Sequence, residues 1–133
     1  MEENNFRQEY PNVEYEKVEI KVMQPGQEIS FSHTTEIDHT RIIGLAQVFS
    51  NEKAVPNSVI RLSVDGQEVF PSGFESKLIY TGQEVPPDER FVQFIDKEAK
   101  QIKVEGLFTD GNALNPFVPY TANIYLRMLT NKS

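Results

Sequence analysis

Residues 59–70 read Val-Ile-Arg-Leu-Ser-Val-Asp-Gly-Gln-Glu-Val-Phe, and this stretch decides the fold. Apolar and polar side chains alternate from Val59 to Val64, which is the period of a strand with one face in the core. Asp65-Gly66 follows, and both central positions of a type I′ turn need positive φ, which an Asp-Gly pair tolerates. The stretch therefore predicts a β-hairpin.

Similar blocks extend in both directions from this hairpin. The segment 17–22 alternates charged and β-branched residues, which predicts a strand with one face in water. The segment 42–49 is almost continuously apolar and predicts a central strand that is covered on both faces. Glycine, proline, asparagine and aspartate separate the blocks. The remaining predicted strands are 27–33, 74–80, 101–108 and 122–130.

About eight short strands with turns between them predict an all-β protein of the β-sandwich class. Eight strands favour a single jelly roll, in which two four-stranded sheets are built from Greek-key connections. An immunoglobulin-like sandwich is the alternative, although the Cys…Trp…Cys spacing of immunoglobulin domains is absent. With 133 residues, we expect one domain at 14–133, preceded by a flexible acidic N-terminal arm at 1–13.

Residues 88–100 fit two structures. Their aromatic and aliphatic side chains fall at helical spacing behind Pro87, which is placed for a first helical turn. The same residues are strand-like in type. We favour a strand at 90–95, a turn at 96–100 and a hairpin partner in 101–108, with a short helix as the alternative.

The charge pattern disfavours binding to nucleic acid. The net charge is −7, and the 13 basic residues are scattered among acidic neighbours, whereas nucleic-acid-binding surfaces cluster lysine and arginine. The chain has no cysteine, which excludes disulfides and thiolate-ligated metals. The N-terminus lacks the features of a signal peptide, and no segment approaches the ~20 apolar residues of a membrane-spanning helix. We therefore expect a protein without a membrane span, located in a virion after synthesis in a host cytoplasm, or otherwise cytoplasmic.

No convincing catalytic motif is present. The two histidines, His33 and His39, lie near Glu36, but three protein ligands are usual at a catalytic metal and there is no third histidine. We interpret residues 34–40 as a solvated polar loop. A serine nucleophile would lack its Gly-x-Ser-x-Gly elbow, and the sequence Asp110-Gly111-Asn112 is explained by a turn. We therefore predict no enzyme activity, no metal and no cofactor.

Several aromatic and arginine side chains are candidates for subunit contacts. Phe6 and Tyr10 are apolar anchors in the acidic arm. Residues 115–120 are apolar for a loop, which predicts either a lid over one end of the sandwich or a subunit contact. The last strand carries tyrosine and arginine on its polar side, and both types are enriched in binding hot spots. The predicted interface residues are Phe6, Tyr10, Phe117, Tyr120, Tyr125 and Arg127.

The segment from Ile60 to Ile95 resembles a known family. It contains the run Ile-Arg-Leu-Ser-Val-Asp-Gly-Gln-Glu-Val-Phe-Pro-Ser-Gly-Phe-Glu-Ser-Lys-Leu-Ile, then Val-Pro-Pro-Asp-Glu-Arg-Phe. This is similar to small single-jelly-roll structural proteins of bacterial viruses, such as minor capsid or vertex (penton) components. The resemblance covers about a quarter of the chain and lies in turn residues. It implies a non-enzymatic virion protein that assembles with copies of itself and with other structural proteins, around a vertex or in a spike.

A second function is open from the residues alone. A β-sandwich also suits a ligand- or glycan-binding adhesion module that uses loops at one end. Tyr120 and Tyr125 are among the aromatic residues available for stacking on a sugar. The absence of tryptophan weakens this interpretation, because sugar-stacking platforms favour large aromatic faces.

Overall fold

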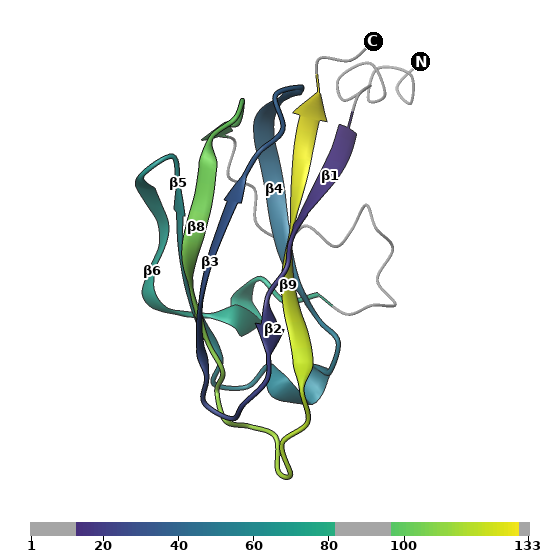
Figure 1. The fold of residues 1–133 in the computed structure, drawn as a ribbon, viewed down its shortest axis with the longest axis vertical. Helices are drawn as coiled ribbons and strands as arrows, with labels where there is room; N and C mark the ends of the chain where they lie inside the picture. Colours follow the sequence, from purple (N-terminus) through teal and green to yellow (C-terminus); the bar gives the residue numbers. More distant parts are fainter. Residues whose placement is uncertain (1–12, 82–96, 131–133) are drawn as a thin grey trace.

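The computed structural model describes residues 13–81 and 97–130 of the chain. They form two antiparallel sheets that pack face to face as a β-sandwich (Figure 1). The all-β prediction is therefore confirmed. The helices within these residues are two short 3₁₀ turns, η1 (Glu52–Ala54) and η2 (Ser76–Leu78), and in this part of the chain no helix is long and apolar enough to cross a membrane.

Nine strand segments make up the two sheets in the described part of the chain. The first sheet contains β1 (Val13–Val18), β2 (Lys21–Val22), β4 (His39–Phe49), β7 (Lys97–Glu98) and β9 (Tyr120–Thr130). The second sheet contains β3 (Glu28–Thr34), β5 (Val59–Val64), β6 (Gln67–Glu75) and β8 (Lys103–Thr109).

Segments β1 and β2 are two parts of one strand. Both pair antiparallel with β9 in a single register, because Val18 faces Ile124 and Lys21 faces Thr121. At the interruption between them, the Ile20 backbone N–H donates to Oδ1 of Asn123 at 2.9 Å. Counting β1 and β2 together reduces the nine segments to eight strands.

The strand order is that of a jelly roll. The first sheet runs β1-β9-β4-β7 and the second runs β3-β8-β5-β6. The strands therefore pair from the ends of the sequence inward: β1 with β9, β3 with β8, β4 with β7 and β5 with β6. This nesting describes a long hairpin rolled into two sheets. The prediction of an eight-stranded jelly roll is confirmed, and the immunoglobulin-like alternative is wrong.

The core lies between the inner faces of the two sheets. Strand β9 alternates strictly, and its inward residues Ile124, Leu126 and Met128 have no exposed surface. Burying a side chain of this size contributes about 2 kcal/mol. Strand β4 is buried on both faces from residue 42 to residue 47, as its continuous apolar run predicts for a central strand.

The turn between β5 and β6 forms as predicted. Asp65 has a φ of 52° and Gly66 has a φ of 79°, which are the two positive values that a type I′ turn requires. Val64 pairs with Gln67 across this turn. The two residues of the turn thus fix the register in which β5 and β6 leave it.

Strand β6 is longer than the sequence predicts. Pro71-Ser72-Gly73 does not end the strand, and β6 continues through these residues to Glu75. Strand β6 is the outer strand of its sheet, and proline is tolerated at a sheet edge because it removes an N–H that need not join the ladder. The predicted strand at 74–80 is therefore wrong beyond its first residues, since η2 follows instead.

The hairpin predicted for 90–108 is wrong where the structure describes it. Strand β7 pairs with β4, where the sequence predicts a turn at 96–100. Strand β8 has β3 on one edge and β5 on the other, so no edge is left for a hairpin partner. Residues 88–96 themselves, and with them the choice between helix and strand, lie outside the described residues, as does the predicted arm up to residue 12.

Candidate functional site

At one end of the sandwich, charged side chains stand where the alternation of β1 places apolar ones. Glu14 and Glu16 share the phase of Val18, which belongs to the core. Glu16 also pairs in register with Leu126, a fully buried residue of β9. The Glu16 carboxylate consequently lies inside the sandwich, and its side chain is only 2% exposed.

Both oxygens of the Glu16 carboxylate are hydrogen-bonded. Oε1 lies 2.5 Å from Nε2 of His33, a residue of β3. Oε2 accepts from the Glu36 backbone N–H at 3.0 Å and contacts Nδ1 of His39. Burial alone would raise the pKa of Glu16, but the Glu36 N–H and the two imidazoles hold that pKa below its usual value.

His39 is the first residue of β4, and a carboxylate faces each of its ring nitrogens. Nδ1 contacts Oε2 of Glu16, and Nε2 lies 2.8 Å from Oε1 of Glu14. A neutral imidazole has a single N–H, so both contacts are hydrogen bonds only when the ring carries two protons. Burial lowers the pKa of His39, but the hydrogen bonds to Glu14 and Glu16 outweigh burial and raise it above its usual value.

The prediction of a solvated loop at 34–40 is wrong for two of its residues, although Glu36 and Ile37 are exposed. Thr35 and His39 are both buried. The Thr35 hydroxyl accepts from the Ile102 backbone N–H at 2.9 Å and donates to the Ala99 carbonyl oxygen. These bonds fasten the turn between β3 and β4 to the chain between β7 and β8. The turn is therefore part of the folded structure and holds His39 in place.

This cluster is not evident from the sequence, because its members come from distant parts of the chain. Glu16 precedes His33 by 17 residues and His39 by 23 residues. Only the pairing of β1 with β9 and the packing of the two sheets bring these side chains together. One signal was available: Glu14 and Glu16 stand at core-facing positions of a strand, and buried charges in proteins are paired.

The opposite end of the sandwich, where a loop joins β8 to β9 (Figure 1), holds a second buried carboxylate, Asp110. Its Oδ2 accepts from the backbone N–H groups of Gly26 at 2.7 Å and Asn112 at 3.1 Å. Its Oδ1 accepts from the Tyr120 hydroxyl. The Asn112 bond closes the turn that the sequence predicts there. Burial and then the neighbouring Asp110 raise the pKa of Tyr120 well above its usual value.

Two of the predicted interface residues belong to this end. Tyr120 is buried and stacks on Phe49, with ring centroids 5.9 Å apart and an interplanar angle of 16°. Tyr120 is therefore a core residue and has little surface for a neighbouring subunit or a sugar to contact. Phe117 is partly buried and packs with Leu114 against the core, which favours the lid interpretation of this loop.

The other predicted interface residues lie elsewhere. Tyr125 and Arg127 occupy outward positions of β9, between the buried ones. Tyr15 of β1 pairs in register with Arg127 and is 45% exposed, so it belongs to the same surface although the sequence analysis did not select it. Phe6 and Tyr10 lie outside the described residues.

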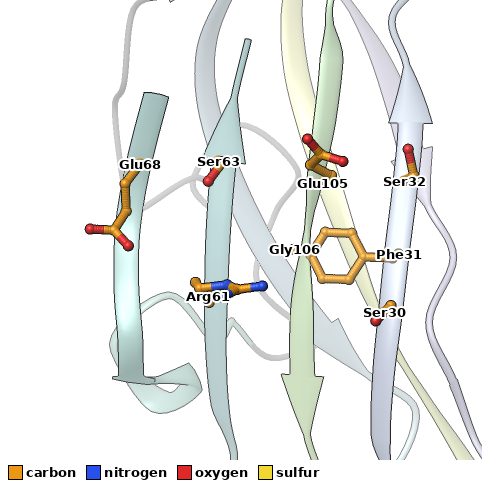
Figure 2. Close-up of a pocket in the computed structure, with 8 residues that line it drawn as sticks. All are labelled: Ser30, Phe31, Ser32, Arg61, Ser63, Glu68, Glu105 and Gly106. Atoms are coloured by element: carbon orange, nitrogen blue, oxygen red, sulfur yellow. The ribbon is translucent and has the colours of Figure 1, made fainter. Parts of the chain in front are cut away.

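The outer face of the second sheet contains a polar hollow of about 450 Å³. Figure 2 shows Gly106 on β8, one of the two inner strands of this sheet, with the Phe31 ring beside it. A Cβ at Gly106 would lie 1.9 Å from the Arg61 carbonyl oxygen, so no other residue fits there without a backbone shift. The hydroxyl and charged residues of the lining are Ser30, Ser32, Ser63, Arg61, Glu68 and Glu105.

Comparison with known proteins finds no match to a family model, to a curated protein or to a solved structure. The resemblance to jelly-roll virion proteins consequently stays a prediction. A fold by itself does not define a function, which depends on the chemistry of particular sites.

Proposed function

We propose that this protein is a non-enzymatic structural subunit that assembles with copies of itself, as vertex or spike components of virus particles do. The observation that carries the proposal is the outer face of the first sheet, where Tyr15, Tyr125 and Arg127 lie on neighbouring strands. Aromatic and arginine side chains are the types enriched at the centres of protein interfaces. Jelly rolls recur as the building blocks of viral capsids.

The chemistry of this outer face suits a second copy of the chain. A guanidinium group is attracted to the face of a tyrosine ring, and this surface carries both groups. Lys17, which pairs in register with Tyr125, adds a second cation to the same surface. A surface that holds both partners of a cation–π contact can bind another copy of itself.

The arm belongs to the same proposal. Strand β1 is the edge strand of the first sheet, and residues 1–12 precede it directly. Phe6 and Tyr10 therefore stay predicted anchors on a neighbouring subunit.

Size-exclusion chromatography with light scattering tests this proposal. We expect a species whose mass is a multiple of the 15.2 kDa chain. Replacing Tyr125 and Arg127 together by alanine should shift it to the monomer. Arg61→Ala, on the outer face of the other sheet, is the matched control and should leave the assembly unchanged. A monodisperse monomer at high protein concentration would contradict the proposal.

A ligand- or glycan-binding module is the second candidate function, and the polar hollow of Figure 2 favours it. Serine hydroxyls, a guanidinium and two carboxylates supply the donors and acceptors that sugar hydroxyls need. A glycan array with the wild type, Arg61→Ala and Tyr125→Ala distinguishes the two candidates. Binding that is lost in Arg61→Ala and kept in Tyr125→Ala would assign the hollow to a glycan.

A further inference from the structure

We propose that the end of the sandwich around Glu16 and His39 binds a divalent transition-metal ion, with zinc as the best match to its donors. The ligand atoms of Glu16, Glu36 and His39 all lie within 4.8 Å of one another. Neighbouring ligand atoms around zinc are about 3 to 4 Å apart, since each lies about 2 Å from the ion. The donors thus need to move by about 1 Å to enclose the ion.

The donor types indicate which ion the site would take. Zinc accepts imidazole nitrogen and carboxylate oxygen together, and three protein ligands with one further position open is a common arrangement. Calcium and magnesium prefer sites built from oxygen ligands alone. His39 has a buried imidazole among the donors, which favours a transition metal over these two ions.

The groups behind the donors are arranged as they are around bound metals. A metal-bound histidine usually donates its other ring N–H to a carboxylate, which fixes the orientation of the ring. The ion would displace the proton of Nδ1 of His39 to solvent. Nε2, which would keep its proton, already lies 2.8 Å from Oε1 of Glu14. If Oε2 of Glu16 binds the ion, Oε1 is already 2.5 Å from Nε2 of His33. Each proposed buried ligand therefore has a partner that holds it.

Charge at this end also favours a cation. Three carboxylates surround two imidazoles, so the group has a net negative charge even when both rings are protonated. A divalent ion between Glu16 and His39 would offset this charge. The two side chains are now in direct contact and would separate, while Glu36 lies in an exposed turn and can close over the ion.

This inference differs from the sequence-based prediction of no metal. That prediction depends on the lack of a third histidine, whereas the missing ligands here are glutamates from β1 and from the turn between β3 and β4. The ion would connect β1, this turn and β4, and would thereby hold the first strand of the sandwich in place. Because the folded chain alone offers the complete site, binding would stabilise the fold.

Calorimetric titration of Zn²⁺ into EDTA-treated full-length protein tests the proposal. We expect saturable binding of one Zn²⁺ per chain and a Tm about 8 °C higher when free Zn²⁺ is about a hundred times the Kd. Glu36→Gln leaves the buried groups intact and should weaken binding by more than about tenfold. His39→Gln should abolish binding. Glu105→Gln, on the outer face of the second sheet, is the control and should bind as the wild type does.

Three results would overturn the proposal. The first is no binding of Zn²⁺ by the wild type. The second is an affinity in Glu36→Gln equal to that of the wild type, which decides the question even if His39→Gln fails to fold. The third is binding of Ca²⁺ or Mg²⁺ as tight as that of Zn²⁺, which would contradict a role for the imidazole.

Discussion

The two ends of the sandwich each bury a carboxylate, but they hold it with different donors. Asp110 accepts hydrogen bonds from two backbone N–H groups and from the Tyr120 hydroxyl. Glu16, at the end where a turn joins β3 to β4 (Figure 1), is held by His33, His39 and one backbone N–H. The donors at the Asp110 end are neutral, whereas the imidazoles at the Glu16 end can carry charge.

Because of this difference, we interpret the Asp110 end as structural and the Glu16 end as the proposed ligand site. Neutral donors supply the hydrogen bonds of both carboxylate oxygens of Asp110. At the Glu16 end, one of the groups that hold the carboxylate is the His39 imidazole, a side-chain type that binds transition metals. The Glu36 carboxylate lies close enough to both to complete the metal site proposed above. The comparison predicts that mutations at both ends destabilise the fold, while a metal acts at one end only.

Glu16→Ala should have the largest effect. It leaves His33 and His39 facing an empty space, and removing one partner of a buried ion pair costs about 4 kcal/mol. Urea unfolding measures the loss. Glu19→Ala is the matched control, because the Glu19 side chain is 51% exposed and should change stability by about 0.5 kcal/mol or less. If Glu16→Ala and Glu19→Ala lost the same free energy of unfolding, the buried Glu16 cluster would not stabilise its end of the sandwich as the comparison requires.

Gly111→Ala should rank second and acts at the Asp110 end. A Cβ at Gly111 would lie 2.4 Å from the Pro56 carbonyl oxygen. The backbone must shift and carry Asp110 with it, so we expect a loss of about 3 kcal/mol in the free energy of unfolding. Gly73→Ala is the comparison: its Cβ meets nothing within 4 Å, but its φ is 89°, so backbone strain should cost about 1 kcal/mol. If Gly111→Ala lowered the free energy of unfolding no more than Gly73→Ala, this would argue against the close approach of residue 111 to the Pro56 carbonyl oxygen.

Tyr120→Phe should cost about 2 kcal/mol, because it removes one donor from a buried carboxylate while the aromatic packing stays. Chemical denaturation of Tyr120→Phe and Tyr125→Phe compares an inward and an outward position of β9. The outward change should cost about 0.5 kcal/mol or less. If Tyr120→Phe cost no more than Tyr125→Phe, the Tyr120–Asp110 hydrogen bond would not stabilise this end of the sandwich.

Alkaline pH should weaken the Asp110 end by a smaller amount. The pKa of Tyr120 is raised in the folded protein, so its contribution is complete below the usual tyrosine pKa of about 10. Above that pH the unfolded chain loses the proton first, and the free energy of unfolding falls as pH rises. The wild type should lose up to about 1.4 kcal/mol per pH unit more than Tyr120→Phe. The prediction would be contradicted if the free energy of unfolding changed equally in the wild type and in Tyr120→Phe between about pH 9 and pH 11.

The fold was largely predictable from sequence because its signals are local. Alternation located the strands, the continuous apolar run of 42–49 marked the buried strand β4, and Asp65-Gly66 marked the tightest turn. The errors arose where position in the sheet overrides residue type. Proline at residue 71 predicts the end of a strand, but β6 continues through it because an edge strand tolerates proline. Residues 101–108 read as a free hairpin partner, but β3 and β5 occupy both edges of β8.

The candidate site was much less predictable. Part of the Asp110 network is visible as a turn, since Asp110 binds the N–H two residues later. The Glu16 cluster has no such local pattern, because His33 and His39 meet Glu16 only after the sheets pack. Spacing along the chain made the histidines look like part of a polar loop. The outward position of Tyr125 and Arg127 was predictable, because strand alternation alone determines it.

Anomalous diffraction at the zinc absorption edge tests the central claim most directly: the Glu16 end is built to receive a cation and the Asp110 end is not. Crystals grown with stoichiometric Zn²⁺ should show one strong anomalous peak bounded by Glu16, Glu36 and His39. The region around Asp110 should show none. A peak at Asp110, or zinc found only on surface carboxylates, would contradict the account.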